Sequence, residues 1–279
     1  MTSTTPATST AVAAPAVSVT GVDKIFATKA GEVTALTGID LAVAPGEFVS
    51  LIGPSGCGKS TLLRLIADLD APSTGSVEVF GTSAHQARLD QKYGIAFQQA
   101  GLLPWRTVAG NIALPLELAG IPAAERTARV EHLVALVGLG DFADRFPDQL
   151  SGGMQQRVAI ARALAKKPAL LLMDEPFGAL DEMTREYMQT ELLRIAADTG
   201  AAVVFVTHSI PEAVYLSDRV VVMSPRPGRI ADIVTMNLGR TADRADDLRE
   251  DGAFFEMITA VREALHGTPV AGARGVETR

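Results

Sequence analysis

The chain has 279 residues, with 25 Lys plus Arg against 32 Asp plus Glu and a formal net charge of −7. With 47% hydrophobic residues and a mean hydropathy of +0.21, the composition is that of a compact globular protein rather than a disordered chain. The acidic balance argues against a primary role on nucleic acid, which requires a clustered basic surface, so we expect no nucleic-acid partner.

The N-terminus and the cysteine content restrict the cellular setting. No apolar run approaches the ~18 residues needed to cross a bilayer. Residues 1–16 lack a basic start and a Leu-rich stretch, so we interpret them as a disordered tail rather than a signal peptide. A single cysteine cannot form an internal disulfide. We therefore expect a cytoplasmic protein that reaches any membrane through a partner.

The first third of the chain has a strand-like pattern followed by a helical one. Apolar alternation within residues 18–52 predicts strands, with a Pro45-Gly46 turn before the buried strand EFVSLI. Apolar residues then recur at helical spacing over Lys59–Leu69, which predicts a helix. Shorter strands are predicted at 76–80 and 93–97.

A glycine-rich segment joins that buried strand to that helix. GPSGCGKS fits the pattern GxxxxGK[ST] in the strand–loop–helix context that the pattern requires. Its glycines let backbone N–H groups turn toward phosphate oxygens, and the helix adds its positive end. Lys59 is expected to reach the β- and γ-phosphates, and Ser60 to offer its hydroxyl to Mg²⁺. The predicted phosphate-binding residues are Gly53, Pro54, Ser55, Gly56, Cys57, Gly58, Lys59, Ser60 and Thr61.

The rest of the chain alternates between helical and strand-like segments. Residues 107–165 are mostly helical in pattern, and Pro122 suits the first turn of a helix. The apolar face of that helix includes Val130, Leu133, Val134 and Val137. Continuous apolar runs return at 169–173, 202–206 and 219–223, as is typical of a parallel sheet covered on both faces. We predict an α/β core with a helical insertion at about 99–165, and an amphipathic helix near 247–265.

Two acidic residues end the run LLLMDE. Asp174 lies where a strand-end carboxylate holds Mg²⁺, generally through water. Glu175, one residue further, is placed to orient or deprotonate a water that attacks the γ-phosphate. The alternative is a solvated acidic pair that ends a strand. No guanine-reading NKxD or TKxD motif is present, which argues against a GTPase.

The segment LSGGMQQRVAIARAL predicts a second phosphate-binding surface. Ser151 is a good N-cap, and the two glycines after it leave backbone N–H groups exposed at the positive end of the helix. One nucleotide already has its loop at 53–61. Two such surfaces in one chain are explained if two chains meet head to tail, each supplying half of a site.

The ordered set GPSGCGKST, FQ, LSGGMQQR, LLLMDEP, GALD and TH resembles the ATP-binding subunit of ABC transporters over roughly residues 17–235. The resemblance implies a P-loop NTPase (RecA-like) parallel-sheet core, an antiparallel β subdomain and a helical insertion subdomain. Residues 236–279 then form a C-terminal extension. ATP and Mg²⁺ are the implied cofactors.

The resemblance also assigns roles to single residues. Gln98 resembles the glutamine that touches Mg²⁺ and the attacking water, and His208 the histidine that contacts the γ-phosphate. Asp181 resembles an aspartate at the dimer interface. The residues expected to contact the γ-phosphate of ATP held by the other subunit are Ser151, Gly152 and Gly153.

Two aromatic residues have open interpretations. Phe26 resembles the adenine-stacking aromatic residue, but the segment ATKAGEVTAL places extra residues between it and the phosphate loop, and Phe26 could instead be a core residue. Trp105, the single tryptophan, either lies near the groove that receives a helix of the permease or packs within the helical insertion.

Two stretches, GLLPWRTVAGNIALPLEL and VVVMSPRPGRI, resemble importers of the nitrate/sulfonate/taurine group, which includes ATPases serving pyrimidine precursors. The implied partners are a second copy of the chain, a membrane permease and an extracytoplasmic solute-binding protein, with the ATPase on the cytoplasmic face of the membrane. A soluble ABC ATPase of DNA repair or translation, or an exporter subunit, are the alternatives. The chain has neither the long coiled-coil insertion nor the second nucleotide domain of the soluble type.

Overall fold

The computed structural model describes residues 14–29, 31–239 and 246–267. Most of the predicted N-terminal tail and the last part of the predicted extension lie outside these ranges. Ala16, which we assigned to the tail, is buried, and its N–H donates to the carbonyl of Val43 at 2.8 Å. The folded part of the chain therefore includes the last residue of the predicted tail.

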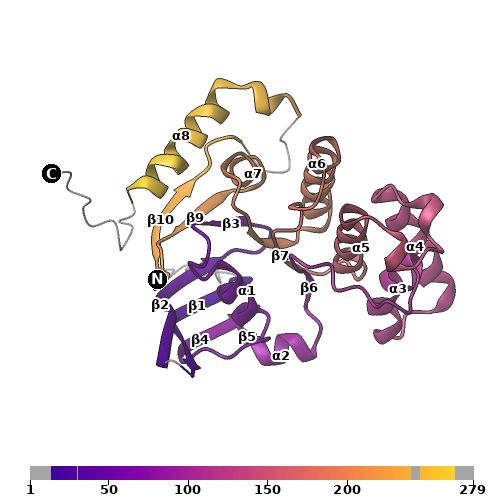
Figure 1. The fold of residues 1–279 in the computed structure, drawn as a ribbon, viewed down its shortest axis with the longest axis horizontal. Coiled ribbons are helices and arrows are strands. Elements are labelled where there is room, and N and C mark those ends of the chain that lie inside the picture. The colour runs from indigo at the N-terminus through magenta and orange to yellow at the C-terminus, as the bar shows by residue number, and fades with distance from the viewer. Residues whose placement is uncertain (1–13, 30, 240–245, 268–279) are drawn as a thin grey trace, which may run out of the picture.

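The strands form two sheets (Figure 1). The four-stranded antiparallel sheet has the order β2-β1-β4-β5, and the six-stranded sheet has the order β10-β9-β3-β8-β7-β6. The strands of the first are β1 (Val17–Thr28), β2 (Gly31–Val43), β4 (Thr74–Val79) and β5 (Thr82–Ser83). The strands of the second are β3 (Phe48–Ile52), β6 (Tyr93–Ala96), β7 (Leu170–Asp174), β8 (Ala202–Val206), β9 (Arg219–Met223) and β10 (Ile230–Thr235).

In the larger sheet, β9, β3, β8, β7 and β6 are parallel, and β10 runs antiparallel to β9 at the edge. The predicted apolar runs form these parallel strands, and all five residues of β7 and of β8 are buried. Because side chains alternate along a strand, Val204 and Val206 belong to one core cluster and Val203 and Phe205 to the other. The sheet is therefore covered on both faces.

Helices cover these faces and form the helical region (Figure 1). The α-helices are α1 (Lys59–Ile66), α2 (Ala84–Leu89), α3 (Val108–Leu118), α4 (Ala123–Leu136), α5 (Gly152–Leu164), α6 (Glu182–Thr199), α7 (Ile210–Leu216) and α8 (Gly252–His266). Short 3₁₀ helices are η1 (Gly140–Phe142), η2 (Pro147–Gln149) and η4 (Asp246–Glu250). None of the helices in the described part of the chain has both the length and the apolar character needed to cross a bilayer.

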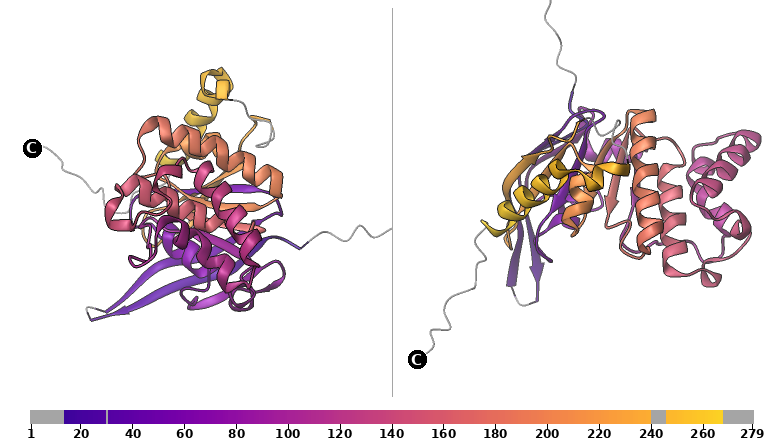
Figure 2. Two further views of the ribbon diagram at one scale, coloured as in Figure 1. Left: turned by 90° about the vertical axis from the view of Figure 1, so that its right-hand side faces the viewer. Right: turned by 90° about the horizontal axis from the view of Figure 1, so that it is seen from above.

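The helical region packs as the sequence pattern predicts. Helix α4 begins directly after Pro122, and the four predicted apolar-face residues are all buried. Helices α3, α4 and α5 contact one another, and α3 and α4 form one end of the molecule, away from α8 (Figure 2). The side chain of Trp105 is 71% exposed, so it does not pack within the insertion.

The C-terminal part of the described chain packs on the larger sheet. Phe254, Ile258 and Val261 of α8 are buried in the same cluster as Tyr215 of α7, and α8 contacts α7, β9 and β10. Helix α8 lies close to the position predicted for the amphipathic helix. Strand β10 was not predicted. All of its residues are exposed or half-buried, so its sequence IADIVT lacks the apolar pattern of a core strand.

Candidate active site

The glycine-rich loop follows β3 and ends where α1 begins at Lys59. Gly56 and Gly58 have positive φ angles of 74° and 104°, which other residues rarely adopt. A Cβ at Gly58 would also lie 2.5 Å from the Leu36 side chain. The Lys59 ammonium donates to the carbonyls of Gly53 at 2.8 Å and Pro54 at 3.2 Å. The loop is therefore a tight turn with its lysine held against it.

Ser60 and Asp174 lie in motifs that are far apart in the sequence but adjacent in the fold. The Ser60 hydroxyl donates to Asp174 Oδ1 at 2.9 Å. Burial raises the pKa of Asp174, and the hydrogen bond from Ser60 partly opposes that effect. A hydroxyl beside a carboxylate is an oxygen donor set of the kind that Mg²⁺ prefers. The two residues therefore fit the predicted cation site.

Glu175 lies at the centre of a second polar group. Gln98 Nε2 donates to Glu175 Oε2 at 3.0 Å, and His208 Nδ1 lies 3.5 Å from the same oxygen. Glu175 has a φ of 47°, and its N–H donates to the Val206 carbonyl at 2.9 Å. The three predicted catalytic residues thus meet beyond the carboxyl ends of β6, β7 and β8, where ligands bind in open α/β sheets.

A pocket of about 320 Å³ brings together Ser60, Gln98 and Glu175 of these groups, whereas Asp174 and His208 lie behind or beside them and are not lining residues. Phe26 of β1 lines it beside the glycine-rich loop, and its ring is 36% exposed. Phe26 is therefore a pocket residue rather than a core residue, as adenine stacking requires. The lining residues are Phe26, Val33, Ala35, Ser55, Gly56, Gly58, Lys59, Ser60, Thr61, Gln98, Glu175 and Arg226.

Arg226 is a lining residue that sequence reasoning missed. It lies in the turn between β9 and β10, and its Nη2 is 3.7 Å from the position of a Cβ on Gly56. The turn is fixed there because the Gly228 N–H donates to Ala35 at 2.9 Å, while its carbonyl accepts from Thr37 at 3.0 Å. In the described residues no hydrogen bond or ion pair engages the Arg226 guanidinium. No local signal in PRPGRI places Arg226 at the pocket, because the pairing of β9 with β3 is a long-range contact.

The second predicted phosphate surface is not part of this pocket. Ser151 caps α5 by accepting the Met154 N–H at 3.2 Å, and Ser151 and Gly152 are exposed. A Cβ on Gly153 would lie 2.9 Å from the Ala179 carbonyl, so this loop packs on residues 177–181. The structure does not bring Ser151, Gly152 and Gly153 to the glycine-rich loop of the same chain.

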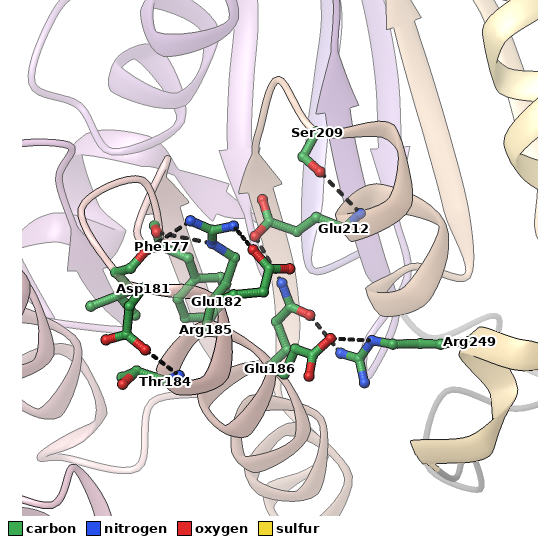
Figure 3. Close-up of polar contacts among 11 residues, drawn as sticks. Phe177, Asp181, Glu182, Thr184, Arg185, Glu186, Ser209, Glu212 and Arg249 are labelled. Atoms are coloured by element: carbon green, nitrogen blue, oxygen red, sulfur yellow. Dashed lines mark hydrogen bonds and ion pairs between the residues drawn. The ribbon is translucent and has the colours of Figure 1, made fainter.

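Asp181 ends the segment 177–181 and caps α6. Its Oδ1 accepts the Thr184 N–H at 3.0 Å, and this hydrogen bond lowers the pKa of Asp181 (Figure 3). Arg185 donates to the Phe177 carbonyl at 3.5 Å and to the Leu180 carbonyl at 2.7 Å. Asp181 therefore lies exposed on a braced turn, beside the Ser151 loop rather than in the pocket.

The fold and the pocket define a P-loop α/β nucleotide hydrolase. The model of the protein family described as "ABC transporter" matches residues 36–178. The chain belongs to the ABC transporter family, and it is an ATP-binding ATPase domain of that family.

Individual relatives support this assignment. An uncharacterised ABC transporter ATP-binding protein of Methanocaldococcus jannaschii is 53% identical over 79% of this chain and 82% of its own length. A taurine import ATP-binding protein of Rhizobium johnstonii is 46% identical over 87% of this chain and 94% of its length. A bicarbonate transport ATP-binding protein of Synechocystis sp. is 51% identical over 82% of this chain but only 35% of its length. A dimeric ATP-binding cassette bound to ADP and Pi superposes with a TM-score of 0.74, at 36% identity over 79% of this chain and 99% of that one.

Proposed function

We propose that the chain is the ATP-hydrolysing subunit of an importer that takes up a small solute through a membrane permease. The solute is of the nitrate, sulfonate or taurine type, or a pyrimidine precursor. Relatives named for taurine import and bicarbonate transport, at 46% and 51% identity, support a small polar cargo. The observation that carries the hydrolytic part is the convergence of Gln98 and His208 on Glu175, because Gln98 and Glu175 line the same pocket as the glycine-rich loop.

Within one chain, each residue has a chemical task. The backbone of residues 53–61 and Lys59 hold the phosphates, and Phe26 stacks on the adenine. Glu175 orients the attacking water and takes its proton, while Gln98 and His208 hold the Glu175 carboxylate and contact the γ-phosphate region. Ser60, Asp174 and Gln98 would hold Mg²⁺, which neutralises charge on the phosphates. Catalysis then depends mostly on positioning and on stabilising the charge of the transferring phosphoryl group, without a covalent enzyme intermediate.

We assign Ser151, Gly152, Gly153 and Asp181 to the site of a partner copy. Their place outside the pocket supports this assignment, as do the exposure of Ser151, Gly152 and Asp181 and the dimeric state of the related cassette bound to ADP and Pi. In a head-to-tail homodimer each copy supplies one loop to the other's nucleotide. ATP closes the dimer and hydrolysis opens it, and this cycle drives the permease. The dimer is held on the cytoplasmic face of the membrane by the permease, which an extracytoplasmic binding protein supplies with solute.

Replacement of Glu175 by Gln tests the hydrolytic assignment. Hydrolysis should fall by about 100-fold or more, because the amide cannot take a proton, while ATP binding remains. ATP-bound Glu175→Gln should therefore accumulate as a dimer in light scattering. A monomer at saturating ATP would contradict the head-to-tail mechanism, and an unchanged turnover would contradict the role of Glu175.

Transport itself is tested in cells that carry either the native chain or its Lys59→Ala form. Uptake of labelled taurine, alkanesulfonates, nitrate, bicarbonate and pyrimidine precursors is measured in both. Loss of one uptake in the variant identifies the cargo. Unchanged uptake of all of them, with the variant confirmed inactive as an ATPase, would contradict the importer assignment for this group of solutes.

A further inference from the structure

A chain of polar side chains runs from the loop that carries His208 to the C-terminal segment. The Thr207 hydroxyl donates to Glu212 Oε2, and Gln189 Nε2 donates to Glu212 Oε1 at 3.0 Å. Arg249 Nη2 in turn donates to Gln189 Oε1 at 2.7 Å. The four residues come from the loop after β8, from α7, from α6 and from η4 (Figure 3 shows Glu212 and Arg249). This set, which we name the 207–249 chain, links four separate elements.

The guanidinium of Arg249 fixes the direction of the two hydrogen bonds that Gln189 makes in the 207–249 chain. A guanidinium only donates, so the Gln189 oxygen must face it and the Gln189 NH₂ must face Glu212. An ionised Glu212 only accepts, so it takes one hydrogen from Gln189 and one from the Thr207 hydroxyl. The oxygen of Thr207 is then free to accept the Ser209 N–H, which it does at 3.0 Å.

The Thr207–Glu212 and Ser209–Thr207 hydrogen bonds hold the residues on either side of His208. Thr207 precedes it, and Ser209 follows it and caps α7 by accepting the Glu212 N–H at 3.4 Å. The side chain of His208 is itself 69% exposed, so packing does not hold it at 3.5 Å from Glu175. Its position depends on the backbone at residues 207 and 209, and that backbone is held by the 207–249 chain.

Stability alone does not explain this arrangement. Thr207, Gln189 and Glu212 are 1%, 5% and 8% exposed, and burial raises the pKa of Glu212. Replacing buried polar sets by apolar residues is often neutral or stabilising, so this set is weak evidence for a contribution to stability. The geometry held here is that of the loop between Thr207 and Ser209.

Arg249 is the outer end of the chain and is well anchored. Its guanidinium carbon lies 3.7 Å from the centre of the Tyr215 ring, and its Nε is 3.9 Å from Glu186 Oε1 (Figure 3). Helix α8, which follows directly, is buried on α7, β9 and β10. A displacement of η4 and α8 would therefore remove the donor that orients Gln189.

We propose that Arg249 is a positioning residue for ATP hydrolysis, acting through Gln189 and Glu212 on the loop of His208. The segment 246–267 thus supports the hydrolytic site through Arg249, which it holds beside Gln189. This inference rests on the proposed role of His208. Arg249 itself does not touch the nucleotide pocket.

The full-length chain with Arg249→Ala tests the proposal in an ATPase assay. The kcat should fall about tenfold with KM for ATP unchanged, because the phosphate loop is untouched. Arg249→Lys retains a donor and should recover most of the rate. Arg262→Ala, an equal charge change at an exposed position of α8, is the matched control and should behave as the native chain.

A double-mutant cycle with His208→Ala distinguishes positioning from a general structural effect. Arg249→Ala should slow the native chain but have no further effect once His208 is absent. Multiplying effects of the two substitutions would overturn the proposal, as would a native kcat in Arg249→Ala while His208→Ala is slow. A loss of rate and melting temperature that persists in Arg249→Lys would also overturn it. If His208→Ala alone has a native rate, the proposed role of His208 fails, and this inference fails with it.

Discussion

The two glycine-bearing loops, 53–61 and 151–153, present similar chemistry but differ in how the chain surrounds them. Both place exposed backbone N–H groups at the start of a helix. The base of the first is packed closely by its own chain: a Cβ on Gly53 would lie 2.7 Å from the Met223 carbonyl, and one on Gly228 would clash with the carbonyl of Cys57. In the second, Ser151 and Gly152 are exposed, a Cβ on Gly152 would meet nothing within 4 Å, and Gly153 alone packs closely, against the Ala179 carbonyl. This difference fits the proposal that the first loop binds nucleotide within a single chain and that the second acts on the nucleotide of a partner copy.

The largest effect is expected at the first loop. Lys59→Ala removes the ammonium that meets the β- and γ-phosphates, so ATP binding to the single chain is lost and turnover falls by about 100-fold or more. Calorimetric titration with ATP and a phosphate-release assay measure the two effects. Native affinity in Lys59→Ala would contradict the view that this loop binds nucleotide without a partner.

The second loop should lose turnover without losing binding. Ser151→Ala leaves ATP affinity of the single chain within about twofold, while turnover falls about tenfold because each site lacks one donor from the other copy. The same titration and assay apply. A large loss of affinity in the single chain would place Ser151 in its own pocket, against the observed geometry.

Mixing the two variants gives the sharpest test of a shared site. In a head-to-tail dimer of Lys59→Ala with Ser151→Ala, one site combines both defects and the other has both native loops. Random pairing makes half of the dimers mixed, so about a quarter of the native sites are restored. An equal mixture should therefore exceed the mean rate of the separate variants. A rate equal to that mean would show that the loops act within one chain.

A smaller effect on ATP binding is expected at Arg226, which faces the first loop from the turn between β9 and β10. Its guanidinium faces the glycine-rich loop, so Arg226→Ala should weaken ATP binding about tenfold and leave kcat nearly unchanged. Arg229→Ala is the matched control, because Arg229 lies in the same turn but interacts with Asp23. Equal losses of affinity in both variants would show a general effect of charge rather than a contact.

The smallest expected effects are opposite changes in stability at two carboxylates. Burial raises the pKa of Asp174, so its charge destabilises the fold above the pKa of the unfolded chain, near 4, and Asp174→Asn should raise the melting temperature at pH 7. The pKa of Asp181 is lowered by its helix-capping hydrogen bond, so Asp181→Asn should slightly lower that temperature at pH 7. The Asp174 difference should vanish below the pKa of the unfolded chain, and the Asp181 difference should begin to shrink as the pH falls below about 4, toward the lowered pKa of the folded chain. Scans from pH 7 to pH 3 measure this, and shifts of the same sign at pH 7 would contradict the assignment.

The features that the sequence predicted correctly are those that depend on residues close together in the chain. The loop at 53–61, the strand that ends at Asp174 and the apolar face of α4 each depend on residues close in sequence. The meeting of Gln98 and His208 with Glu175 was implied only by the family resemblance, which assigned Gln98 and His208 to the region of the γ-phosphate where Glu175 was expected to act.

The parts that sequence reasoning missed depend on contacts between distant segments. Arg226 reaches the pocket because β9 pairs with β3, about 170 residues earlier in the chain. The local sequence around Gln189 and Glu212 shows only that they lie in helices. The packing of α6, α7 and η4 is what brings them together with Arg249. Strand β10 and helix α2 lack a strong pattern because few of their residues are buried.

The burial of Cys57 has a practical consequence for spectroscopy. Its side chain is 1% exposed and it is the single cysteine of the chain, so thiol reagents have no accessible native target in the folded protein. A cysteine introduced at Met183, which is 83% exposed two residues after Asp181, would therefore carry a spin label at one defined place. Distances between two such labels would report directly on whether nucleotide brings two copies face to face.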